Sequence, residues 1–199
     1  MPHSLIGKPA PALTTLRNYD GNVYDFQPAN IGTPTALFFF PKAGSYGCTR
    51  EVCQFRDALE DAGALWVPIY LPRNPDKIEF KDTHVHVVGV SPDSVDKLKA
   101  FAEKQKVNYP ILSDEKGEAR KLYSPGKSFF GLSEARTTFF IDQTGVVRDV
   151  YESTINFSAH VKFVTKALHD WEKEHKKEGD KPAQAEPAPA AGGAEAPPA

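Results

Sequence analysis

Two cysteines in a glycine-rich stretch are the residues of this chain with the clearest chemistry. Cys48 and Cys53 are the only cysteines among 199 residues, and Cys48 follows a turn that contains Gly44 and Gly47. Two cysteines are too few for a four-cysteine zinc site or a disulfide-stapled scaffold. Two cysteines close together in a chain are typical of redox chemistry, although the four intervening residues do not match the Cys-x-x-Cys spacing of thioredoxin-type sites.

Cys48 is expected in the first turn of a helix that follows a buried strand. The apolar run at 36–40 predicts the strand, and helix-forming residues occupy 51–62 before Gly63. Unpaired backbone N–H groups and the helix dipole stabilise an anion at a helix N-terminus. A thiolate is such an anion, and the pKa of a cysteine there can fall from about 8.5 to about 3.5–7.5. Ser45 can offer a hydroxyl to the same pocket, and the polar neighbours of Cys48 predict an accessible thiol.

Two other interpretations of these residues stay open at this point. Free cysteines are often small hydrophobic residues of the core, without any reactivity. A metal site would need further ligands, and His84 and His86 could share one face of a strand. Nothing in the sequence connects these histidines to Cys48, and we interpret them as ordinary strand residues.

The elements expected around the cysteines alternate between strands and helices. Strands are predicted at 84–90, 109–112, 137–141 and 146–151, and a short hairpin at 13–16 and 23–26. One helix is predicted from Ser91 as N-cap and Pro92 as its first residue to about Lys106. The last helix is predicted at 158–174, where Val161, Val164, Leu168 and Trp171 form one apolar stripe. The pattern indicates an α/β fold with a mixed sheet.

Composition divides the chain into a domain at 1–175 and a tail at 176–199. The tail is rich in Ala and Pro, has no large apolar residue and is expected to be disordered. The stretch 65–83 contains three prolines and is interpreted as an insertion or as a hidden edge strand.

Charge and hydropathy exclude several classes of protein. The net charge of -2 disfavours a general nucleic-acid binder. The longest apolar run, 36–40, is too short to cross a bilayer, and the N-terminus does not resemble a secretory signal. We therefore expect no membrane segment and a cytoplasmic location, with the nucleus as the alternative.

The residues around Cys48 resemble the active-site motif of the peroxiredoxins. Pro41, Ser45 and Cys48 fit the pattern P-x-x-x-T/S-x-x-C, and residues 48–57, CTREVCQFRD, resemble the bacterioferritin-comigratory-protein or peroxiredoxin Q subfamily. Further matches are GKPAP at 7–11, GVSPDS at 89–94, LSD at 112–114 and RTTFFID at 136–142. The chain departs from the subfamily at Ser45, where threonine is usual, and at Tyr46, where proline is usual.

The resemblance implies a thioredoxin-like fold, with a central mixed β-sheet flanked by helices, and a thiol peroxidase for hydrogen peroxide and organic hydroperoxides. Cys48 is then the peroxidatic nucleophile, which peroxide converts to a sulfenic acid. Arg136 matches the active-site arginine that stabilises the thiolate and orients the peroxide. Ser45 is expected to hydrogen-bond the peroxide, and Pro41 to shield the thiolate.

The second half of the implied cycle belongs to Cys53. It is expected to attack the sulfenic sulfur and form an intramolecular disulfide, which thioredoxin or a similar dithiol reduces. The cycle needs no metal or other cofactor and no second subunit, so a monomer suffices. Glu51 is expected either to orient the arginine or to be a solvated acid of the first helical turn.

Two competing functions use the same cysteines. One is a non-enzymatic redox sensor or binding module on the same fold, which oxidises once and signals through a partner. The other is a general disulfide oxidoreductase. Catalytic turnover of peroxide with a thioredoxin system distinguishes the peroxidase from both.

Overall fold

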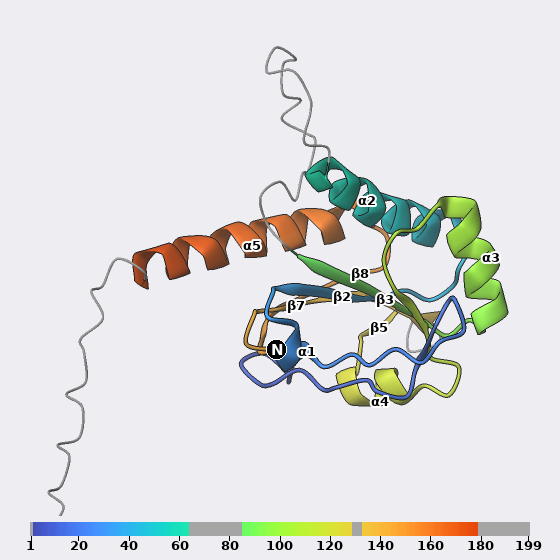
Figure 1. Cartoon of the computed structure of the whole chain (residues 1–199), viewed down its shortest axis with the longest axis horizontal. Coiled ribbons are helices and arrows are strands. Elements are labelled where there is room, and N and C mark those ends of the chain that lie inside the picture. Colours follow the sequence, from blue (N-terminus) through green and yellow to red (C-terminus); the bar gives the residue numbers. More distant parts are fainter. Residues whose placement is uncertain (1, 64–84, 129–132, 179–199) are drawn as a thin grey trace, which may run out of the picture.

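A six-stranded mixed sheet forms the centre of the protein (Figure 1). The computed structural model describes residues 2–63, 85–128 and 133–178. In spatial order the strands are β1 (Arg17–Asn18), β4 (Ile111–Ser113), β3 (His86–Ser91), β2 (Thr35–Phe39), β7 (Arg136–Ile141) and β8 (Val147–Ser153). Strands β2, β3 and β4 are parallel, whereas β1, β7 and β8 are antiparallel to their neighbours. A separate ribbon joins β5 (Lys127–Ser128) to β6 (Ser133–Glu134). The predicted mixed α/β sheet is confirmed.

Helices cover both faces of the sheet. The helices are α1 (Pro28–Ile31), α2 (Tyr46–Gly63), α3 (Val95–Gln105), α4 (Glu118–Tyr123) and α5 (Ser158–Glu178). Figure 1 shows α2, α3 and α5 over one face, and α1, α4 and the N-terminal segment over the other. All the helices that carry the candidate active site therefore share one layer.

Strand β2 is buried on both faces, which explains its uninterrupted apolar sequence. Alternate side chains of a strand point to opposite faces, and Phe38 packs under α2, where its ring stacks on Phe55 at 4.5 Å. Phe39 faces the other layer and contacts Tyr123 of α4 at 5.6 Å between ring centroids. Because β2 packs against an apolar cluster on each face of the sheet, its position between the two layers is fixed. The point where α2 begins is therefore fixed as well.

The strand order brings the start of β7 close to the start of α2, where the candidate site lies. β7 runs antiparallel to β2, with Thr137 opposite Phe39, so the first residue of β7 lies at the carboxyl end of β2. The first residue of β7 is Arg136. At the same end of the sheet, the chain passes from β2 through a loop into α2. Arg136 and Cys48 therefore meet although 88 residues separate them.

Two boundaries differ from the prediction. Ser91 does not cap a helix: it is the last residue of β3, and α3 begins at Val95 with Ser94 as its N-cap. The Ser91 hydroxyl instead donates to the Asp93 carboxylate, which also accepts from the backbone N–H of Ala43. The Asp93 carboxylate therefore links the end of β3 to the loop before α2.

The ends of the other predicted elements agree within a few residues, except for the hairpin predicted at 13–16 and 23–26, which is present only as the isolated bridges Leu13 to Phe26 and Arg17 to Val23. Helix α5 continues to Glu178, three residues into the expected tail, while residues 179–199 and the stretch 65–83 lie outside the described residues. The domain division thus stays a prediction. Within the described part of the chain, no helix is long and apolar enough to cross a membrane.

Candidate active site

Cys48 is the third residue of α2, in its first turn, and its sulfur contacts a guanidinium. Arg136 Nη2 donates to Cys48 Sγ at 3.3 Å. The side chain of Cys48 is 0% exposed, because it packs into the core with Val52 and Phe55 and beneath Arg136. The expectation of an accessible thiol is therefore wrong for this conformation, whereas its predicted place in the first helical turn is confirmed.

Arg136 is held by Glu51 of α2 and by two residues of the loop between β8 and α5. Its Nη1 donates to the backbone carbonyl of Thr154, and its Nε lies 3.1 Å from Glu51 Oε2. The guanidinium also stacks over the ring of Phe157 at 5.5 Å from the ring centroid. These contacts, together with 8% exposure, direct one end of the guanidinium to the Cys48 sulfur. Arginine suits this role because its planar fork can bind several partners at once.

Gly47 provides the space in which the guanidinium lies. A Cβ atom at this position would stand 2.6 Å from Arg136 Nη2 and 3.0 Å from two ring carbons of Phe157. Both distances are shorter than an ordinary van der Waals contact. The glycine before the cysteine therefore permits the close approach of Arg136 to the start of α2.

Glu51 is a buried acid, not a solvated one. Its side chain is 0% exposed, and burial raises its pKa to about 8 against the opposing charge of Arg136. Of the two expectations for Glu51, the one of a contact with the arginine agrees with the structure.

His160 is a residue of this cluster that the sequence analysis missed. It lies on α5, is fully buried, and its Nδ1 is 3.6 Å from Glu51 Oε1. Burial lowers the pKa of His160 to about 4. A signal was present in the sequence, because His160 precedes Val164 and Leu168 at intervals of four and so belongs to the apolar face of the last helix.

Cys53 lies one and a half turns further along α2 and has different surroundings. Its thiol is half-buried and donates to Gln105 Oε1 at the end of α3, at 3.5 Å. Burial raises the pKa of Cys53, with the charge of Arg56 opposing the shift. Both cysteines are free thiols, and the continuous helix holds them apart.

The loop that precedes α2 contains the other two predicted site residues. Pro41 lies two residues after the end of β2 and is partly exposed. Ser45 is also partly exposed, and its hydroxyl donates to the carbonyl of Lys42 at 3.0 Å, while its own carbonyl accepts from Thr49 N–H. Gly44 takes a positive φ of 83° at the turn between them. The loop thus places Ser45 directly before the first residue of α2, with Pro41 four residues earlier.

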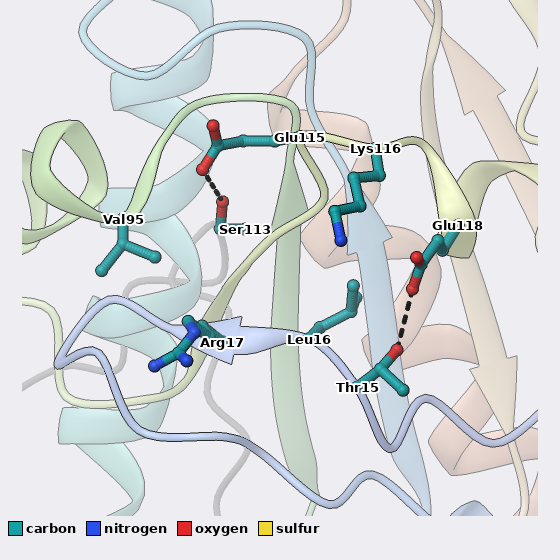
Figure 2. A pocket seen from close by; sticks show the side chains of 8 residues that line it. All are labelled: Thr15, Leu16, Arg17, Val95, Ser113, Glu115, Lys116 and Glu118. Atoms are coloured by element: carbon teal, nitrogen blue, oxygen red, sulfur yellow. Dashed lines mark hydrogen bonds between the residues drawn. The ribbon is translucent and has the colours of Figure 1, made fainter.

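A separate pocket of about 470 Å³ lies at the edge of the sheet formed by β1 and β4. Figure 2 shows its lining, which includes a hydrogen bond of 2.8 Å between Thr15 and Glu118 and one of 3.2 Å between Ser113 and Glu115. None of the residues of the cysteine site lines it. Among the described residues, no three His, Cys, Asp or Glu side chains gather in a group that could hold a metal ion.

Known proteins with similar sequences are peroxiredoxins. The model of the AhpC/TSA family matches residues 74–150. Peroxiredoxin Q, chloroplastic, from Sedum lineare is 31% identical over 154 residues, which are 77% of this chain and 73% of that protein. Peroxiredoxin Q, chloroplastic, from Suaeda salsa is 31% identical over 158 residues, which are 79% of this chain and 65% of that protein.

Solved structures agree with the sequence matches. Peroxidoxin BcpB from Mycobacterium tuberculosis superposes with a TM-score of 0.66 and 28% identity, over 84% of this chain and 98% of its own. A peroxiredoxin Q from Xanthomonas campestris, at 24% identity and over 78% and 90% of the two chains, has the same fold with a TM-score of 0.61. The thioredoxin-like fold is thereby confirmed. With its cysteine at the head of α2 and its relatives among the AhpC/TSA proteins, this chain belongs to the peroxiredoxin Q family of thiol peroxidases.

Proposed function

We propose that Cys48 is the peroxidatic cysteine and that it reduces hydrogen peroxide and organic hydroperoxides. The observation that carries the proposal is the contact of 3.3 Å between Arg136 Nη2 and Cys48 Sγ at the first turn of α2. A guanidinium and a helix N-terminus both stabilise a thiolate, which is the nucleophilic form of cysteine. The thiolate attacks one peroxide oxygen, the O–O bond breaks, and the other oxygen leaves as water or alcohol after taking up a proton. The sulfur is oxidised to a sulfenic acid and the peroxide is reduced.

The neighbouring side chains orient the peroxide and limit access to it. Arg136 has further N–H groups with which to hold a peroxide oxygen in line with the sulfur. Ser45 offers a hydroxyl from the loop before the helix, and Pro41 shields the thiolate from one side. Because Cys48 is fully buried, a peroxide can reach it only after a small opening of this loop or of Phe157.

Cys53 is proposed as the resolving cysteine, and its use requires α2 to unwind. Five residues of regular helix give a rise of about 7.5 Å and a Cα separation of about 8.7 Å. A disulfide needs Cα atoms within about 7 Å. The continuous helix from Tyr46 to Gly63 is therefore incompatible with the bond. The sulfenic acid at Cys48 is attacked by Cys53 once this segment has opened, the disulfide forms and water is released.

An external dithiol then restores both thiols by exchange, and thioredoxin is the reductant proposed here. Disulfide formation within one chain lets a monomer complete the cycle. A cytoplasmic location stays a prediction, since the plant relatives are named as chloroplastic proteins.

Turnover of peroxide by the single-cysteine variants tests these assignments. Cys48→Ser should abolish peroxide reduction, because a hydroxyl is not ionised at neutral pH. Cys53→Ser should react once with peroxide and then stop with a thioredoxin system, while forming a sulfenic acid that a dimedone probe captures at Cys48. Substantial turnover by Cys48→Ser would refute the assignment. A wild-type protein that oxidises once without turnover would support the redox sensor instead.

Amide hydrogen exchange tests the unwinding. Exchange over residues 47–56 should be faster in the oxidised protein than in the reduced one, and should slow again after reduction by thioredoxin. Equal protection in both states, or a disulfide that joins Cys48 only to a second chain, would contradict intramolecular resolution.

A further inference from the structure

The end of α3 and the residues that follow it bind α2 at three points close to Cys53. The Cys53 thiol donates to Gln105 Oε1 at 3.5 Å, and Arg56 Nη1 donates to the backbone carbonyl of Gln105. The hydroxyl of Tyr109 donates to the carbonyl of Val52 at 2.9 Å. All three contacts lie at the end of the segment that must unwind before Cys53 can reach the other cysteine.

Gln105 is fixed to α2 through its own backbone. It is the last residue of α3, and the chain leaves the helix at Lys106, which takes a left-handed φ of 51°. The last carbonyls of a helix have no partner within it and carry the negative end of its dipole, so a guanidinium is a favourable partner there. Arg56 supplies that guanidinium, and its Nη2 also lies 2.6 Å from Asp57 Oδ1. The side chain of Gln105 therefore starts from a fixed point beside Cys53.

The contact with Gln105 favours the unreactive form of Cys53. A thiol has one proton to donate, and the amide oxygen of Gln105 accepts it, whereas a thiolate would face the lone pairs of that oxygen. Burial also raises the pKa of Cys53 against the charge of Arg56, which agrees with a neutral thiol in the folded helix. Resolution needs the opposite on both counts, because Cys53 must leave the helix and attack as a thiolate.

We propose that Gln105 is a positioning residue for the resolving step, and that its contact with the Cys53 thiol sets how fast the sulfenic acid at Cys48 becomes a disulfide. The proposal rests on the roles proposed for the two cysteines. Unwinding of α2 breaks the contact with Gln105 Oε1, and the freed thiol loses its proton to water. The thiolate attacks the sulfenic sulfur, the S–S bond forms, the S–O bond breaks, and the leaving hydroxide takes up a proton to become water.

The rate of this step decides how often Cys48 is oxidised too far. A second peroxide can oxidise the sulfenic acid to a sulfinic acid: its O–O bond breaks, one oxygen is transferred to the sulfur, and the other leaves as water or alcohol. The yield of sulfinic acid at a given peroxide concentration follows the ratio of this oxidation to resolution. By slowing resolution, Gln105 lowers the peroxide concentration at which the protein is inactivated.

The first test is the rate of disulfide formation after one equivalent of peroxide, measured by rapid quenching and mass spectrometry. Gln105→Met has a side chain of similar length without the amide oxygen, and should form the disulfide about threefold faster, as expected for one lost hydrogen bond. Gln105→Glu keeps an acceptor oxygen and adds a negative charge that disfavours the thiolate, and should be no faster than the wild type. Lys104→Met, at the exposed neighbouring position of α3, is the matched control and should keep the wild-type rate. An unchanged rate in Gln105→Met, or equal acceleration by Gln105→Glu, would overturn the proposal, because a packing effect does not distinguish the two variants.

The second test is the yield of sulfinic acid at Cys48 after turnover at one fixed peroxide concentration. Gln105→Met should give about threefold less sulfinic acid than the wild type, because resolution competes better with the second oxidation. The second-order rate of Cys48 with the first peroxide should be the same in both proteins. A change in that first rate would place the effect of Gln105 before resolution and contradict the proposal.

Infrared spectroscopy distinguishes this proposal from the proposed function, because it needs no turnover. In a Cys48→Ser background the S–H stretching band belongs to Cys53 alone. Gln105→Met should move this band to the frequency of an unbonded thiol, and Lys104→Met should leave it in place. A band that Gln105→Met does not move overturns the contact even where Cys48 is the reactive cysteine. Residual peroxide turnover by Cys48→Ser would instead refute the peroxidase assignment while the band still responds to Gln105.

Discussion

Replacing Gly47 by alanine should lower the reactivity of Cys48 without unfolding the protein. The new Cβ would stand 2.6 Å from Arg136 Nη2, whereas ordinary contacts begin near 3.4 Å, so the guanidinium must withdraw by about 0.8 Å. A shift of that size away from the sulfur lengthens the contact of 3.3 Å with Cys48 Sγ to about 4.1 Å. Arg136 cannot turn freely to avoid it, since Thr154, Glu51 and Phe157 hold its other atoms.

The expected loss of Cys48 reactivity follows from the weaker attraction between the Arg136 guanidinium and a thiolate at the longer distance. At an effective dielectric constant of about 20, the attraction between guanidinium and thiolate weakens by about 1 kcal/mol. A change of about 1 kcal/mol corresponds to about fivefold in an equilibrium or a rate that depends on this attraction. Alanine is at the same time the better helix former by about 0.5–1 kcal/mol, which offsets part of the strain against Phe157. Stability and reactivity should therefore change independently.

The assay is the alkylation of Cys48 by iodoacetamide in a Cys53→Ser background below neutral pH, together with the melting temperature. Gly47→Ala should react about fivefold more slowly and melt within a few degrees of the parent protein. In an Arg136→Leu background the same change should have almost no further effect, because the displaced group is absent. An equal loss in both backgrounds would show that Gly47→Ala acts through the helix or Phe157, and would refute the argument from displacement.

Three further predictions concern other parts of the molecule. Arg136→Lys should lower the second-order rate with peroxide at least tenfold, because an ammonium cannot contact Thr154, Glu51 and the sulfur together; an unchanged rate would contradict its role. Burial acts to raise the pKa of Asp142, but hydrogen bonds from Thr144, Val146 and Arg148 lower it overall. The stability that Asp142 contributes is thus complete above its unfolded pKa of about 3.9 and is lost as the pH falls through the lower folded value. Urea unfolding between pH 6 and pH 3 should show this loss in the wild type and a flatter profile in Asp142→Asn. Deleting residues 179–199, which contain no large apolar side chain, should leave the melting temperature and the peroxidase rate unchanged, and a marked fall in either would show that the segment docks on the domain.

Local signals were sufficient for the elements that carry Cys48. The run at 36–40 has the pattern of a strand buried on both faces, and it became β2; the glycine-rich turn and the following helix formers became the loop and α2. Local signals failed at Ser91. A serine followed by a proline is typical of the start of a helix, and this pattern does not show that the Ser91 hydroxyl is already bound to Asp93. The Asp93 carboxylate accepts from Ser91 and Ala43, a tertiary contact that a local pattern does not contain.

The partners of Cys48 were less accessible to sequence reasoning. Arg136 was assigned by resemblance, because no local property distinguishes it from a surface arginine at the start of a strand. Its contact with the sulfur depends on β7 pairing antiparallel with β2, which is a property of the sheet. His160 lies on α5, and its meeting with Glu51 depends on the packing of α5 along α2. Such contacts follow from strand order and helix packing, and a motif of eight residues does not specify either.

The arrangement also explains why this edge of the sheet is suited to a reactive thiol. The carboxyl end of β2 supplies a helix N-terminus, and the antiparallel start of β7 delivers a cation to the same point. Burial strengthens the attraction of that cation for a thiolate and equally for the other nearby acid, Glu51, whose pKa burial raises to about 8 against the charge of Arg136. Arg136 also donates to the carbonyl of Thr154, so the sulfur is one of three groups around the guanidinium. The stabilisation that Arg136 can give to a Cys48 thiolate therefore depends on how its contacts are divided among these three partners.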